Sequence, residues 1–158
     1  MINLNLKFLY FCLLLIPALV FAGEDNQVTV SIQSIACSEE KAAGDEKLTV
    51  DPQLQGLKKK LKDIPYKDFN LACSRSVVVP MKEKQHLTLD DGDKLSLELL
   101  YVDEERVGLW IDWRDPKGMQ LLDTRMHFGC HETMLAGADG GEGSDSGKVL
   151  AIAITEKP

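Results

Sequence analysis

The clearest pattern in this chain lies in residues 94–114, which read KLSLELLYVDEERVGLWIDWR. Apolar and polar residues alternate before and after the acidic residues 103–105, and this alternation is typical of two half-buried strands joined by a turn. Because the acidic residues lack the glycine or asparagine of a two-residue turn, we expect a three-residue loop that pairs Val102 with Arg106. The segment therefore predicts an antiparallel hairpin.

A second hairpin is expected to follow directly. Residues 115–118 read DPKG, a strong turn signal, and a loop of these residues pairs Arg114 with Met119. A slip of one residue in either register would turn the apolar residues to the solvent side, so the two registers support each other. Together they predict one core face, made of Leu95, Leu97, Leu99, Tyr101, Val107, Leu109, Ile111, Trp113, Leu122, Thr124, Met126 and Phe128.

Outside these hairpins the chain predicts further strands and one helix. Strands are expected near residues 28–33, 69–80, 84–90, 131–136 and 148–156. The helix is expected at residues 52–62, with Asp51 as its N-cap, Pro52 in its first turn and Leu54, Leu57 and Leu61 on its buried face. The expected fold is α+β and β-rich, a mostly antiparallel sandwich or partly open barrel of about seven or eight strands with one helix.

The N-terminal residues predict export. Lys7 is the only charged residue in 1–22, an apolar run fills residues 8–20, and Ala22 precedes a polar stretch. This is the pattern of a cleaved signal peptide, and the run is shorter than the ~20 residues of a membrane-spanning helix. We therefore expect a signal peptide at 1–22, with an uncleaved anchor as the alternative, and one globular domain at 23–158 that is periplasmic or secreted.

The net negative charge of the chain disfavours nucleic acid and anionic lipid as partners. The net charge is −7 for the full chain and becomes −8 for the expected mature chain, because the signal holds one lysine and no acid. An acidic protein repels nucleic acid and anionic lipid overall. We expect no integral membrane insertion after cleavage, and a partner that is another envelope protein, for example in an assembly or secretion apparatus.

Three cysteines remain after signal cleavage: Cys37, Cys73 and Cys130. In an oxidising compartment two of them can pair and leave one thiol free. Because Cys37 follows one predicted strand and Cys73 opens another, we expect a Cys37–Cys73 disulfide. The alternative is three buried, unpaired thiols.

The face opposite the predicted core carries Trp110, Asp123, Arg125 and Arg106. The expected register puts Trp110 opposite Asp123, with Arg125 diagonal and able to lie across the indole. Tryptophan and arginine are common anchors of protein interfaces, so these four residues form a candidate partner-binding surface. The competing interpretation is a solvated face of charge pairs around one tryptophan.

Other chemistry is weakly indicated. His127, Cys130 and His131 form a His-x-x-Cys-His cluster whose imidazole and thiolate groups suit zinc or copper, but no fourth ligand lies nearby in sequence. A small metal-binding protein is therefore the alternative function. No catalytic motif is present, so we expect a non-enzymatic protein without a cofactor, and an exported hydrolase ranks third.

Several segments resemble a family of exported bacterial proteins that has no established activity. The segments are DPQL at 51–54, YKDF at 66–69, LDDGDKL at 89–95, LLDT at 121–124 and GKVLAIAI at 147–154, together with Leu57 and Leu61. The resemblance implies an exported α+β domain and nothing catalytic.

Overall fold

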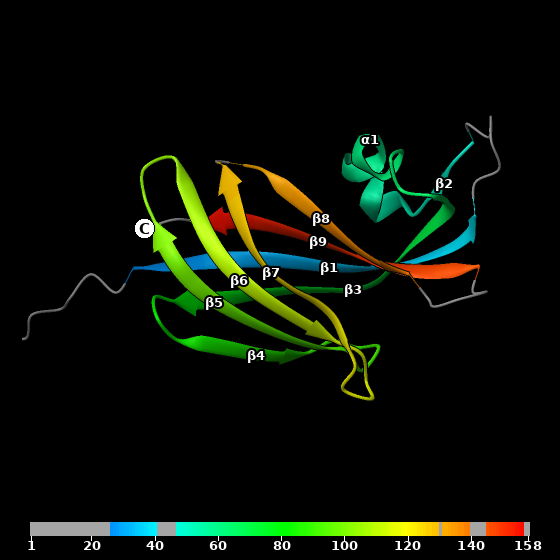
Figure 1. Ribbon diagram of the computed structural model, residues 1–158. Coiled ribbons are helices and arrows are strands. Elements are labelled where there is room, and N and C mark those ends of the chain that lie inside the picture. Colours follow the sequence, from blue (N-terminus) through cyan, green and yellow to red (C-terminus); the bar gives the residue numbers. More distant parts are fainter. Residues whose placement is uncertain (1–25, 41–46, 130, 140–144, 157–158) are drawn as a thin grey trace, which may run out of the picture.

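The alternating segments form two β-sheets that pack against each other in the computed structural model (Figure 1), which describes residues 26–40, 47–129, 131–139 and 145–156. The predicted signal peptide at 1–22 lies outside the described residues. The larger sheet has the order β2-β3-β1-β9-β8 and the smaller has the order β4-β5-β6-β7. The predicted fold class, α+β and β-rich, is confirmed, and the sheets do not close into a barrel.

The strands of the larger sheet are β1 (Gln27–Glu40), β2 (Thr49–Val50), β3 (Tyr66–Pro80), β8 (Thr133–Asp139) and β9 (Ser146–Glu156). The strands of the smaller sheet are β4 (Lys84–Thr88), β5 (Lys94–Val102), β6 (Arg106–Arg114) and β7 (Gln120–Gly129). All neighbouring strands are antiparallel except β2 and β3, which are parallel. The short strand β2 was not predicted from the sequence.

The main core lies between the two sheets. The predicted core face of β5, β6 and β7 is confirmed, with Trp113 and Phe128 fully buried, except for one residue, Tyr101. The larger sheet contributes alternate residues of β1, including Val30 and Ile32, from its inner face. A half-buried strand thus points every second side chain into the core, as the sequence pattern requires.

Tyr101 is the exception because β5 contains a bulge. The predicted β5–β6 register holds from Lys94 to Leu99, and then one extra residue, Leu100, shifts it. Tyr101 therefore lies beside Gly108 on the outer face, and the turn that follows is shorter than the three-residue loop we expected. A Cβ at Gly108 would lie 2.3 Å from the Tyr101 ring, so only glycine leaves room for this ring.

The predicted β6–β7 register is wrong by two residues, although the predicted faces are correct. The turn closes with a bond from the Asp115 N–H to the Met119 carbonyl, and Gly118 adopts a φ of 90°. Leu121 adds a bulge, because Trp113 pairs with Leu122 while the next residue of β6 pairs with Gln120. The turn and the bulge each shift the register by one residue. The combined shift of two residues leaves each side chain on its predicted face.

The predicted helix at 52–62 is a 3-10 helix, η1 (Pro52–Leu57), followed by one α-helical turn, α1 (Lys58–Leu61). Asp51 caps it as predicted and accepts a hydrogen bond from the Gln53 N–H at 2.9 Å. Leu54 and Leu61 are fully buried, whereas Leu57 is only half-buried. These leucines pack on the larger sheet at the face turned away from the smaller sheet.

Candidate binding face

The outer face of the smaller sheet, which points away from the core, is the candidate site. The described helical residues, η1 and α1, lie on the larger sheet and leave this face uncovered (Figure 1). Cross-strand pairing arranges its side chains in rows, because residues paired across neighbouring strands share a face. The row through the predicted tryptophan contains Lys84, Glu98, Trp110 and Arg125, and the next row contains His86, Ser96, Asp112 and Asp123.

Trp110 is held by two polar neighbours. Its Nε1–H donates a hydrogen bond to Asp123 Oδ1 at 2.7 Å, and Lys84 Nζ lies 4.4 Å from the ring centroid. Lys84 Nζ is also 3.7 Å from a carboxylate oxygen of Glu98. The half-exposed indole is therefore fixed in orientation by a hydrogen bond and by a cation over its face.

Three of the four predicted surface residues lie together. Arg125 is the direct cross-strand partner of Trp110, and Asp123 is diagonal to it, which reverses the predicted arrangement. Arg106 lies apart, at the far end of β6, where it pairs with Gly129 and lies 4.0 Å from Asp103. Trp110, Asp123 and Arg125 therefore form one cluster without Arg106.

Lys84 belongs to this cluster and was missed from the sequence. The β4–β5 hairpin pairs it with Glu98, which in turn pairs with Trp110. The length of the turn decides this placement. The Leu89 N–H donates to the Asp93 carbonyl, so the loop is residues 90–92, whereas a loop of 90–93 would pair Lys84 with Leu99 on the core face. The structure records Lys84, rather than Arg125, as the cation over the indole.

The residues of the predicted metal cluster are only partly described. His127 lies on the outer face, where its Nδ1 is 2.8 Å from the Tyr101 hydroxyl and the two rings stack at 5.8 Å. His131 lies in the turn after β7 with a φ of 61°, and Cys130 lies outside the described residues. No group of three potential metal ligands occurs among the residues that the structure describes.

The predicted Cys37–Cys73 disulfide is absent, and both thiols are free and buried. The two cysteines are not cross-strand partners, because Cys37 pairs with Phe69 and Cys73 pairs with Ser34, three residues away along β1. A third bulge, with Ala72 as the extra residue in β3, also puts them on opposite faces. The bulge turns Cys73 into the core between the sheets, whereas Cys37 lies in the apolar cluster under the helix. Burial raises the pKa of the Cys37 thiol to about 12.

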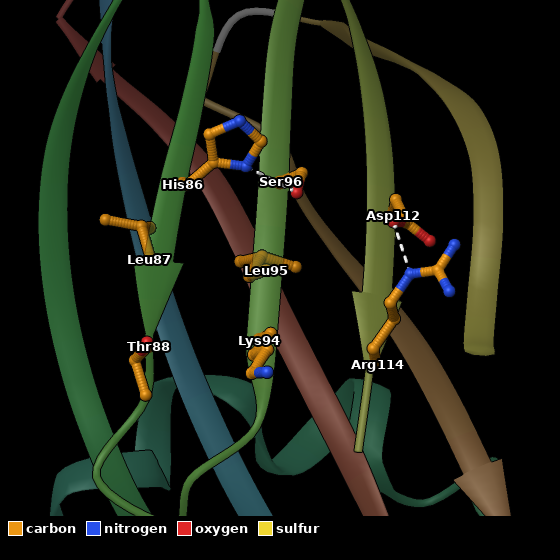
Figure 2. Close-up of a pocket in the computed structure, with 8 residues that line it drawn as sticks. All are labelled: His86, Leu87, Thr88, Lys94, Leu95, Ser96, Asp112 and Arg114. Atoms are coloured by element: carbon orange, nitrogen blue, oxygen red, sulfur yellow. Dashed lines mark hydrogen bonds and ion pairs between the residues drawn. The ribbon is translucent and has the colours of Figure 1, made fainter. Parts of the chain in front are cut away.

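A pocket of about 220 Å³ opens among β4, β5 and β6 (Figure 2), at the rows next to that of Trp110. It is lined by His86, Leu87, Thr88, Lys94, Leu95, Ser96, Asp112 and Arg114. His86 Nδ1 lies 2.9 Å from Ser96 Oγ, and Arg114 Nε donates to Asp112 Oδ2 at 2.8 Å. The pocket is therefore walled by two side-chain pairs whose geometry is fixed by mutual hydrogen bonds.

Asp112 is unusual among these residues. It is only 8% exposed, and its Oδ1 has no hydrogen-bond partner within the described part of the chain. Its contact with the Arg114 guanidinium, through a hydrogen bond and opposite charge, raises the pKa of Arg114. The strand pattern placed Asp112 on the outer face but could not reveal that it is buried there.

An ionic link that contains one buried carboxylate joins the two sheets and was also missed. Asp93, which precedes β5, is fully buried and accepts hydrogen bonds from Trp113 Nε1 at 3.0 Å and from Lys148 Nζ at 2.8 Å. Lys148 lies on β9 and also contacts Asp91 Oδ2 at 3.1 Å. The turn at 90–93 therefore anchors one sheet to the other.

A comparison of the chain with known protein families, curated proteins and solved structures found no match. The resemblance to a family of exported bacterial proteins therefore stays a prediction. Across the described residues, none of the helices has the length and apolar character needed to span a membrane.

Proposed function

We propose that this protein is an exported, non-enzymatic domain that binds another protein of the cell envelope through the tryptophan cluster, defined as Lys84, Glu98, Trp110, Asp123 and Arg125. The supporting observation is the half-exposed Trp110, whose indole is fixed by Asp123 and Lys84 on a sheet face without a covering helix in the described chain. The predicted signal peptide supports the location.

The tryptophan cluster is suited to binding a partner because its central side chain is already ordered in the free protein. A partner that buries a mobile side chain loses binding free energy to ordering it, whereas the Trp110 ring is already oriented before contact. Tryptophan and arginine dominate the energetics of many interfaces, and Trp110 and Arg125 are direct cross-strand neighbours. The charges around them are of both signs, so the cluster favours a partner surface with complementary mixed charges.

The experiment is crosslinking capture from an envelope fraction with the purified mature protein as bait. The double variant Trp110→Ala, Arg125→Ala is expected to capture at least about tenfold less of the specific partner than the wild-type protein. The reason is that interface anchors of this kind carry most of the binding free energy. The readout is quantitative mass spectrometry of captured proteins.

Matched controls are the variants Met119→Ala and Arg75→Ala. Met119 is 63% exposed in a turn, and Arg75 is an exposed arginine of β3 on the larger sheet. They remove an exposed apolar side chain and an exposed arginine outside the cluster. If the double variant of the tryptophan cluster captures every partner as well as the two control variants do, the proposal is rejected.

A further inference from the structure

We propose that the pocket among β4, β5 and β6 binds a small oxyanion, a carboxylate or phosphate group, between Lys94 and Arg114. The two cationic residues pair directly across β5 and β6, and both line the pocket. Like charges that face each other across neighbouring strands destabilise a sheet. Asp112 offsets one of these two charges, and an anion between the two cations would offset the other.

Hydrogen bonds within the protein fix the orientation of the Arg114 guanidinium. Its Nε donates to Asp112 at 2.8 Å, one terminal nitrogen donates to Gln120 Oε1 at 3.0 Å, and the other lies 3.4 Å from the Gly118 carbonyl. A guanidinium carries five N–H donors, so these bonds fix its plane and still leave donors for an oxyanion. A fixed guanidinium loses little freedom on binding.

Two cations, Lys94 and Arg114, line the pocket together with one carboxylate, so the formal charge of the lining stays positive despite Asp112. Its side chain is 11% exposed, whereas the side chain of Arg114 is 41% exposed and Lys94 is exposed. A ligand that enters from solvent can therefore reach the two cations more easily than the carboxylate. Asp112 acts as a positioning residue, because it binds the guanidinium from the buried side.

Neutral donors complete the pocket. His86 and Ser96 are hydrogen-bonded to each other at one end, and Thr88 lies in the same row as Lys94 and Arg114. Hydroxyl and imidazole groups can donate to the remaining oxygens of a carboxylate or phosphate. The volume of about 220 Å³ admits a small molecule and not a folded chain.

This inference goes beyond the proposed partner surface and does not depend on it. Trp110 does not line the pocket, and Lys94 does not contact the indole in any recorded interaction. A Trp110→Ala variant should therefore retain anion binding even where it loses the protein partner. The two proposals can fail separately.

The test is an amide NMR titration of the mature protein at constant ionic strength. Sodium chloride is replaced stepwise by sodium phosphate in one series and by sodium acetate in another, up to about 50 mM, so that a dissociation constant in the millimolar range can be measured. We expect saturable shifts centred on Ser96 and Arg114 with at least one of the two anions. The series that saturates identifies phosphate or carboxylate as the preferred group.

Variants then locate the site. Lys94→Gln is expected to weaken binding at least about fivefold and Arg114→Gln at least about tenfold, because charge-assisted bonds to an oxyanion are lost. Lys117→Gln removes one exposed lysine from the neighbouring turn and should change affinity less than about twofold. Since Arg114→Gln also leaves Asp112 without its partner, Lys94→Gln, at an exposed position, provides the test that is independent of folding.

Shifts that stay linear over the whole range in both series would overturn the proposal. Equal loss of affinity in Lys94→Gln and Lys117→Gln would also overturn it, because that result would reflect net charge alone.

Discussion

At the scale of single residues, the two described cysteines differ from what the predicted compartment suggests. Cys37 and Cys73 are buried on opposite faces of the larger sheet, so their sulfur atoms cannot meet without a change in strand register. A thiolate is the reactive form of cysteine, and burial disfavours it. The raised pKa of about 12 at Cys37 therefore indicates an inert thiol.

The expected result is that native protein at about pH 8 is not alkylated at Cys37, because the thiolate fraction there is negligible. Unfolding in denaturant without reductant should make both Cys37 and Cys73 alkylatable. Peptide mass mapping measures this directly. Detection of a Cys37–Cys73 linked peptide would contradict the structure.

The residues of the candidate site were predictable to different degrees. Alternation placed Trp110, Asp123 and Arg125 on one outer face, because side-chain direction alternates along each stretch of strand that has no bulge. The pairing within that face depends on loop length and bulges, and these moved Arg125 opposite Trp110. Burial of Asp112 depends on neighbouring side chains, which the sequence pattern does not contain.

At the scale of elements, the strands contain bulges that were not predicted from the sequence. Leu100 and Leu121 are the extra residues in β5 and β7, and each stands next to another leucine. An apolar doublet breaks strict alternation, and one of its two members must leave the core or enter a bulge. Doublets of this kind were therefore a usable signal, and the Ala72 bulge in β3 likewise lies in an apolar run, Leu71-Ala72-Cys73.

The helical segment provides the stability prediction for an element. Leu61→Ala should lower the free energy of unfolding by about 2–5 kcal/mol, because it removes a fully buried side chain from the cluster under the helix. Leu57→Ala, at a half-buried position of the same segment, should cost clearly less. Urea denaturation of both variants measures the difference. Equal losses would show that α1 does not dock as described.

At the scale of the whole molecule, the link from Lys148 to Asp93 and Asp91 holds the two sheets together. Burial lowers the pKa of Lys148, but hydrogen bonds and negative charge from Asp93 and Asp91 outweigh burial and raise the pKa overall. A raised pKa in the folded state means that folding favours the charged amine. The resulting stabilisation is complete below the pKa of the unfolded chain, about 10.4, and is lost as pH rises through the folded pKa.

The expected outcome is a steeper loss of stability in wild type than in Lys148→Met between about pH 9 and pH 12, since the variant has no amine to deprotonate at this position. The midpoint of urea denaturation at several pH values measures the slope. Lys117→Met, which removes an exposed lysine from the β6–β7 turn, serves as the control and should follow wild type. Parallel slopes for wild type and Lys148→Met would contradict the role of the link.

The position of β1 between β3 and β9 has a consequence for how the chain folds. Strands β4 to β7 pair in sequence order, so this sheet can form from local hairpins. The larger sheet instead needs β9 to reach β1 across almost the whole described chain, and such distant pairing makes folding slow, on the order of milliseconds to seconds. Until β9 arrives, one edge of β1 exposes unpaired backbone groups that can recruit other chains, so aggregation during folding should begin at this edge.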